Sequence, residues 1–291
     1  MYNTGYELLK ITKEKKIKIS DVVVQNECKV LEKSESEIRN KMKENLKVMI
    51  ESSKQGLDGE IKSISGLIGG DAKRVNDYIN TKKTTICGNT LNKAMARALS
   101  CSEINAAMGK IIAAPTAGSC GILPASIITS AEVLNLDENA MINALFTAAG
   151  IGQIIAKNAT LSGAEGGCQA ECGSASAMAA AAIVEMAGGT PEMSLNAAAI
   201  ALKNILGLVC DPIAGLVEAP CAKRNASGTV NAMLAADLAL AGVKSIIPFD
   251  EVVEAMYNVG KSLPHELRET ALGGVAATKS GKEIENNIFD K

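Results

Sequence analysis

The stretch SASAMAAAAIVEMA at residues 174–187 has small or aliphatic side chains at almost every position and one charged residue, Glu185. A helix of this composition is apolar around its whole circumference, which is typical of a helix buried on every face. A similar composition, rich in Ala, Gly, Ile, Leu and Met, extends from about Ile86 to about Asp250. We therefore expect this region to form the core of the protein.

Breaks that contain glycine and proline divide the region into separate helices. The breaks are APTAGSCG, LSGAEGGC, GGTPEM and CDPIAG. The predicted helices cover approximately residues 91–112, 124–134, 138–157, 174–187, 193–207, 226–241 and 249–260. Because strand-like alternation is almost absent, we expect an all-α fold whose alanines and glycines let the helices approach closely.

Three segments follow from composition, and together they predict one compact domain. Residues 1–85 form a helical layer, best seen in the charged, helix-favouring stretch SEIRNKMKENLKVMIES at residues 36–52. Residues 86–280 form the helical core. Residues 281–291 form a polar tail that we expect to be frayed.

Charge and composition exclude several classes of protein. The 291 residues carry a formal net charge of −2 with only 2% aromatic residues, so they offer no basic or base-stacking surface for nucleic acid. The N-terminus lacks the apolar core of a signal peptide, which predicts a cytoplasmic protein. Two uncharged stretches, 111–131 and 139–156, approach bilayer length, but Pro115, Pro124 and several polar residues indicate buried interior and no membrane.

Cysteines and polar residues gather in glycine-rich loops of the apolar core. Buried polar loops cost stability unless they are satisfied, so four of them favour a functional site, although helix capping gives an ordinary alternative. Cys168, Cys210 and Cys221 lie in three separate turns without a CxxC pair. Spacing alone does not separate metal ligands from small buried apolar side chains. The four loops are residues 63–73, 114–124, 157–173 and 208–226.

Several of these strings resemble the signature blocks of the α chain of iron-sulfur-dependent L-serine dehydratases, and the resemblance covers nearly the whole chain. The blocks are SGLIGGDA, APTAGSCGILP, SGAEGGCQAE, CDPIAGLVEAPCAKRNA and LRETALGG, in that order. The resemblance implies a four-iron, four-sulfur cluster held by Cys168, Cys210 and Cys221. Cys120 falls in the implied substrate loop. The other cysteines match no ligand position: Cys28, Cys87, Cys101 and Cys172.

The implied reaction converts L-serine to pyruvate and ammonia, in amino-acid degradation and gluconeogenesis. A four-iron cluster with three thiolate ligands leaves one iron open, and an open iron acts as a Lewis acid toward a substrate oxygen. Loss of the α-proton and of hydroxide gives aminoacrylate, which tautomerises and hydrolyses without further catalysis.

A general base is missing from these blocks. His265, the sole histidine, lies in SLPHELRET, where the start of a surface helix is at least as good an interpretation as catalysis. Lys62 is a second weak candidate, since burial lowers a lysine pKa. Single-chain enzymes of the resembling family carry a histidine motif in a separate N-terminal domain, and two-chain enzymes carry that domain on a β subunit. The resemblance therefore implies a β-subunit partner; a higher oligomer is also compatible with the sequence.

Polar residues in the loops are candidates for substrate binding. Thr116, Gly118 and Ser119 offer donors to a carboxylate at a helix start, with ordinary capping as the alternative. Lys62 and Ser65 offer the same from the N-terminal loop, although a solvated lysine is the simpler interpretation of Lys62. Weaker candidates lie beside the cysteine blocks: Lys157, Asn158, Glu165, Glu171 and Arg224.

Three other functions compete with this interpretation. A pyridoxal-phosphate dehydratase needs an α/β scaffold, which the all-α prediction disfavours. An iron-sulfur L-cysteine desulfidase stays open, because a thiol can replace the hydroxyl at the open iron. A non-catalytic iron-sulfur sensor needs exposed reactive cysteines and a partner-binding face.

Overall fold

The computed structural model describes residues 2–289. Within that range the chain forms helices and no β-strand, which confirms the predicted all-α fold. Extended pairing is limited there to two isolated backbone bridges, Lys62 with Gly69 and Cys210 with Arg268.

The α-helices are α1 (Gly5–Lys15), α2 (Ile19–Leu31), α3 (Glu35–Asp58), α4 (Asp71–Thr81), α5 (Gly88–Ala106), α6 (Ile122–Leu134), α7 (Glu138–Asn158), α8 (Gly163–Gly166), α9 (Ser174–Met186), α10 (Pro191–Lys203), α11 (Cys221–Leu240), α12 (Phe249–Ser262) and α13 (Lys279–Phe289). Short helical turns lie between them: η1 (Ala117–Ser119), η2 (Gln169–Gly173), η3 (Ile213–Gly215), η4 (His265–Leu267) and η5 (Gly274–Ala277). The turn η2 is a π-helix and runs directly into α9.

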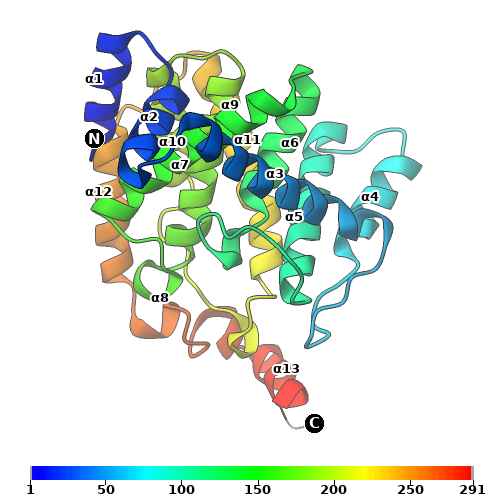
Figure 1. The fold of residues 1–291 in the computed structure, drawn as a ribbon. Helices are drawn as coiled ribbons and strands as arrows, with labels where there is room; N and C mark the ends of the chain where they lie inside the picture. Colours follow the sequence, from blue (N-terminus) through cyan, green and yellow to red (C-terminus); the bar gives the residue numbers. More distant parts are fainter. Residues whose placement is uncertain (1, 290–291) are drawn as a thin grey trace.

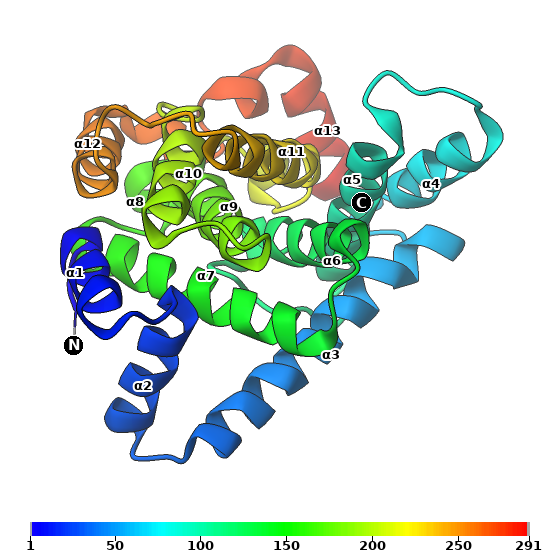
Figure 2. The same ribbon diagram turned by 90° about the horizontal axis from the view of Figure 1, so that it is seen from above.

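Helix α9 lies at the centre of the molecule. Every residue from Ser174 to Glu185 is buried, as the uniformly apolar composition predicts. Helices α6, α7, α10 and α11 pack around it, and the view in Figure 2 looks onto this arrangement, with α9 between α7 and α11. Because these helices pack around α9, its N-terminal end is held in place relative to them.

Close helix packing depends on small residues at the contacts. A Cβ at Gly228 of α11 would lie 2.6 Å from Ile122 Cδ1 and 3.0 Å from Ser176 Oγ. Ser176 Oγ also donates to the Gly228 carbonyl at 2.9 Å. A Cβ at Gly121 would lie 2.4 Å from the Ala98 carbonyl oxygen, so glycine is required where α6 approaches α5.

The first turns of two peripheral helices, α2 and α4, donate hydrogen bonds to buried carboxylates of core helices. Glu185 of α9 accepts from the amide of Ile19 at 2.9 Å and from that of Ser20 at 3.3 Å, at the start of α2. Glu103 of α5 accepts from the amides of Asp71 and Ala72, at the start of α4. Each carboxylate satisfies amides that a helix N-terminus leaves unpaired, and its negative charge suits the helix dipole.

The predicted helices match the observed ones best in the middle of the chain. Helices α6, α7, α9 and α12 begin and end within two residues of prediction. Helix α5 was expected to continue to residue 112, but it ends at Ala106, and Met108 then takes a positive φ of 59°. Helix α11 was expected to begin near residue 226, but it begins at Cys221, so this cysteine lies on a helix and not in a turn.

The proposed division into residues 1–85, 86–280 and 281–291 stays a prediction. A single hydrophobic cluster contains residues of the first two segments, including Leu8, Val23 and Ala179. The tail was expected to be frayed, whereas Lys279–Phe289 forms α13 at the lower edge of Figure 1. The last two residues of that tail lie outside the described residues.

Two apolar segments are long enough to cross a membrane by length and composition. They are Ala117–Leu134 and Glu138–Asn158, with 72% and 61% of their windows buried inside the fold. Core helices of soluble proteins have the same properties, and the burial agrees with the expectation that both are interior.

Glu185 predicts a specific dependence of stability on pH. Burial raises its pKa above the ordinary 4.5 in the folded protein, although hydrogen bonds from Ser20, Thr147 and Ile19 act against this. Because the folded-state pKa is raised, the favourable contribution is present below the unfolded pKa and is lost as pH rises through the folded pKa. The free energy of unfolding of the wild type, relative to Glu185→Gln, should therefore increase as pH falls from about 8 to about 5. Urea unfolding at several pH values measures this; a constant difference would contradict it.

Candidate metal centre

The three predicted ligand cysteines are buried and lie at the ends of helices or beside them. Cys168 precedes the continuous helical run of η2 and α9, and Cys221 is the first residue of α11. Cys210 lies on an extended segment: its amide donates to the Leu267 carbonyl at 2.9 Å, and its carbonyl accepts from the Glu269 amide at 2.7 Å. Their exposed fractions are 3%, 8% and 3% for Cys168, Cys221 and Cys210. Helix N-termini favour negative charge, so two of these positions suit thiolates.

The three thiols act on one another electrostatically. Burial raises the pKa of Cys221 to about 12, and the Cys168 thiolate contributes. Burial likewise raises the pKa of Cys210, with a further contribution from Cys168. The charge of Cys168 therefore acts on both other thiols at their buried positions. A cation bound there would relieve both the burial of charge and the mutual repulsion.

Cys168 differs from the other two in the direction of its pKa shift. A hydrogen bond from Cys172 lowers its pKa, burial acts against this, and the guanidinium of Arg224 lowers it further. The two sulfur atoms lie 3.4 Å apart. The π-turn η2 brings the two thiols together.

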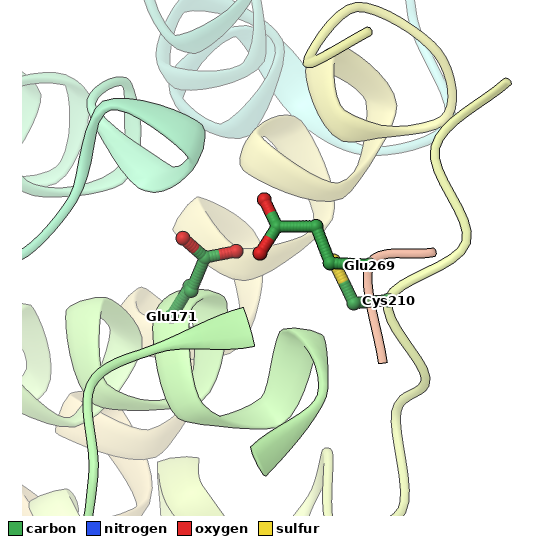
Figure 3. A group of neighbouring side chains, drawn as sticks. All are labelled: Glu171, Cys210 and Glu269. Atoms are coloured by element: carbon green, nitrogen blue, oxygen red, sulfur yellow. The ribbon is translucent and has the colours of Figure 1, made fainter. Parts of the chain in front are cut away.

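Two carboxylates converge on Cys210. The ligand atoms of Glu171, Cys210 and Glu269 all lie within 4.8 Å of one another, and Figure 3 shows the two carboxylates facing each other. Burial raises the pKa of Glu171, a hydrogen bond from Thr116 lowers it, and the charge of Glu269 raises it again. This group includes one of the three predicted cysteines. It provides acceptors for a cation beside the thiols.

Gly163 makes room for this group. A Cβ at Gly163 would lie 2.7 Å from Glu171 Oε2 and 3.1 Å from Cys210 Sγ. The glycine-rich block SGAEGGC therefore has a steric role in the site in addition to its role as a break between helices.

The predicted substrate loop reaches the site through Thr116 and Gly118. The Thr116 hydroxyl interacts with Glu171 and lies 3.1 Å from Ser119 Oγ. A Cβ at Gly118 would lie 3.3 Å from Glu171 Oε1. Ser119 is fully buried, its hydroxyl lies 3.5 Å from the Thr116 carbonyl oxygen, and among the described residues no side chain caps the start of η1.

Other predicted residues lie farther from the carboxylates or on the surface. Ser65 donates to Glu218 Oε2 at 2.7 Å, which ties the N-terminal loop to the segment before Cys221. Lys62 and His265 are exposed, and within residues 2–289 no hydrogen bond or ion pair joins either side chain to the site. Lys157 and Asn158 instead bind the N-terminal residues Tyr2 and Asn3.

Three residues of the site were not predicted from the sequence: Glu269, Asp211 and Asn225. Glu269 and Asp211 stand in the blocks LRETALGG and CDPIAG, but charged residues in loops are usually solvated, so nothing distinguished them. Asn225 is almost fully buried and accepts from the Gly121 amide at 2.8 Å. Its amide nitrogen donates to the carbonyls of Gly118 at 2.7 Å and Cys221 at 3.0 Å. This one side chain joins the substrate loop to α11.

The site thus combines buried thiols with two carboxylates in an all-helical fold. Residues 14–276 match the family model described as "Serine dehydratase alpha chain", and this chain belongs to that family.

Relatives support the assignment over the whole length. "Probable L-serine dehydratase, alpha chain" of Bacillus subtilis (strain 168) is 54% identical over 289 residues, which are 99% of this chain and 96% of the relative. "L-serine dehydratase, alpha chain" of Peptoniphilus asaccharolyticus is 54% identical over 289 residues, 99% of both chains. "L-serine dehydratase TdcG" of Escherichia coli (strain K12) is 35% identical over 285 residues, 94% of this chain and 61% of the longer relative.

Replacing Asn225 should loosen the substrate loop. Asn225→Ala removes three hydrogen bonds and leaves buried partners unsatisfied, so it should lower the free energy of unfolding by about 1–3 kcal/mol. Amide hydrogen exchange at residues 116–121 should become faster. Asn204→Ala is the control, because Asn204 is exposed and binds Asn231 at the surface. Equal effects of the two variants on residues 116–121 would contradict the assigned role.

Proposed function

We propose that this chain is the α subunit of an L-serine dehydratase that converts serine to pyruvate and ammonia with a four-iron, four-sulfur cluster. The observation that carries the proposal is the burial of Cys168, Cys210 and Cys221, together with the two carboxylates that lie beside Cys210. The full-length similarity to chains named L-serine dehydratase, alpha chain, supports the same activity.

The residues present fit the proposed cluster. Thiolates are the usual ligands of iron-sulfur clusters, and the three thiols lie where helix ends or backbone pairing fix them. The mutual repulsion that disfavours three thiolates in the protein alone would be offset by iron. When bound, a cluster with three protein ligands would supply a Lewis acid for the leaving hydroxyl.

The chain's own residues contribute binding and orientation. The loop at Thr116 and Gly118 would receive the serine carboxylate, since it combines a hydroxyl with backbone donors near a helical turn. Glu171 and Glu269 would receive the α-ammonium group, because they supply two acceptors that face each other beside Cys210. These contacts would hold the α-carbon and the hydroxyl on one side of the site.

The proton on the α-carbon needs a base that this site does not supply among the described residues. His265 and Lys62 are exposed, and neither contacts the thiols or the carboxylates. We propose that a β subunit supplies the base and closes the site in a reducing, cytoplasmic environment. The α-proton goes to that base and the hydroxide leaves; the resulting aminoacrylate tautomerises and hydrolyses to pyruvate and ammonia.

The first test reconstitutes the chain anaerobically with iron and sulfide, alone and with its β chain, and measures iron content and pyruvate formation. Cys168→Ser, Cys210→Ser and Cys221→Ser should each lose cluster and activity, and air should inactivate the intact enzyme. Cys28→Ser is the control, because Cys28 lies on α2 away from the site. A full cluster in any of the three variants would remove that cysteine from the ligand set.

The same experiment tests the location of the base and the identity of the substrate separately. Poor turnover by the α chain alone and rapid turnover after mixing would support a base on the β chain. Full activity of the α chain alone would place the base in this sequence. Release of sulfide from cysteine at a higher kcat/KM than turnover of serine would favour the desulfidase instead.

Glu269→Gln tests the contact with the ammonium group. Loss of the charge should raise KM for serine about tenfold or more, with a smaller change in kcat. The inhibition constant of 3-hydroxypropionate, which keeps the carboxylate and hydroxyl but lacks the ammonium group, should stay unchanged. Glu266→Gln is the control, because Glu266 is an exposed glutamate of the same segment. A lower kcat with unchanged KM would contradict ammonium binding.

A further inference from the structure

Arg224 contacts the segments that carry the proposed ligands. It lies on α11, three residues after Cys221, and its side chain is 17% exposed. Its Nη1 donates to the Val209 carbonyl at 2.8 Å, and its Nη2 lies 2.8 Å from Asp211 Oδ1. Val209 and Asp211 are the two neighbours of Cys210. The guanidinium thus holds the backbone on one side of Cys210 and the side chain on the other.

Beside the hydrogen bond from Cys172, the charge of the same guanidinium lowers the pKa of the Cys168 thiol. Arg224 therefore joins α11, which begins at Cys221, to the extended segment with Cys210, and its charge acts on Cys168. Hydrogen bonds between backbone groups hold Cys210 to Leu267 and Glu269. The Gln169 amide also donates to the Leu208 carbonyl at 3.0 Å, so Arg224 adds side-chain contacts to a backbone link between the Cys168 and Cys210 segments.

Asp211 extends the connection to the C-terminal segment. It is almost fully buried, and its Oδ2 accepts from the Val275 amide at 2.7 Å. A Cβ at Gly274 would overlap the Asp211 carboxylate, so the glycine at φ +60° lets the backbone approach. Asp211 is thus fixed from two directions, and Arg224 has a rigid partner.

The chemistry of arginine suits this position. A guanidinium presents several N–H donors in one plane at fixed angles, so it can bind a carbonyl, a carboxylate and a sulfur at the same time. A lysine ammonium keeps the charge but not the planar arrangement of donors. We propose that Arg224 is the positioning residue that holds the three thiols in the arrangement needed to bind a metal-sulfur group. This inference rests on the proposed function for the identity of that group, but not for the contacts.

The test uses the full-length chain without cluster, under anaerobic conditions, titrated with Co²⁺ alone. Thiolate-to-cobalt charge-transfer absorbance reports thiol ligation, and its saturation gives the affinity. The wild type should show this absorbance, and Cys168→Ser should weaken it. Arg224→Gln should lower the affinity about 10- to 100-fold, as expected when a residue that orients metal ligands is lost. Arg224→Lys should not restore it.

Lys223→Gln is the matched control. Lys223 is the preceding residue on α11, but it is exposed and pairs with Asp71 instead of a cysteine segment. The Lys223→Gln variant should bind Co²⁺ with the same affinity as the wild type. Asp211→Asn is the second variant in case Arg224→Gln fails to fold: it keeps the size of the side chain, weakens the contact with Arg224 and should give an intermediate loss of affinity. Circular dichroism confirms the fold of each variant.

Three outcomes would overturn the inference. They are an absence of thiolate-cobalt absorbance in the wild type, wild-type affinity and spectrum in both Arg224→Gln and Asp211→Asn, and full restoration by Arg224→Lys. A chain that shows the expected cobalt binding but produces no pyruvate with its β chain would refute the proposed function and leave the role of Arg224 intact. The two failures are therefore distinguishable.

Discussion

The close approach of four helices to α9 is the constraint on which the rest of the structure depends. Side chains from Ser174 to Glu185 are buried on every face, and most are alanine or serine. Small side chains bring helix axes together and leave little volume to adjust, because protein interiors are closely packed. Ser176 and Gly228 mark the limit of this helix approach. The Ser176 hydroxyl of α9 donates directly to the Gly228 carbonyl of α11. A larger residue at either position would separate α9 from α11, the helix that begins at Cys221.

The candidate centre is a consequence of that packing. Because α9 continues from η2 and α11 lies beside it, the start of each helix brings a cysteine to the same end of the core. Cys210 arrives on an extended segment held by the residues that follow η4. The rigid part of the site therefore comes from two core helices, and its adaptable part comes from loops. Loop residues supply Thr116, Glu269 and the carboxylate of Asp211, which fits the usual distribution of binding groups over a rigid scaffold.

The sequence predicted the core better than it predicted the contacts within the site. Helix α9 was found because glycine stands at both of its ends. The start of α11 was missed because Ala219-Pro220 precedes a cysteine, and proline directly before Cys221 looked like a turn. The three cysteines could be selected only through resemblance to a family, since their spacing matches no ligand motif. Glu269 is 98 residues away from Glu171 in the sequence, so their contact depends on the tertiary fold. Arg224 was noted only for its position beside Cys221.

The capping of α2 by a carboxylate far along the chain bears on the order in which the nascent chain assembles. Helix α2 leaves the ribosome long before Glu185, which is 166 residues from Ile19. The partner of the Gly5 amide is synthesised later still, because the amide donates at 2.7 Å to Asp250, which lies 245 residues away in the sequence. During translation the apolar faces of the first helices therefore have no final partner, and contacts of such sequence separation form slowly. The N-terminal layer is accordingly expected to dock last, after the alanine-rich core has formed. Because the centre of the fold lies so late in the chain, the apolar faces of the first helices stay exposed for an interval during synthesis. The chain is prone to aggregation in that interval.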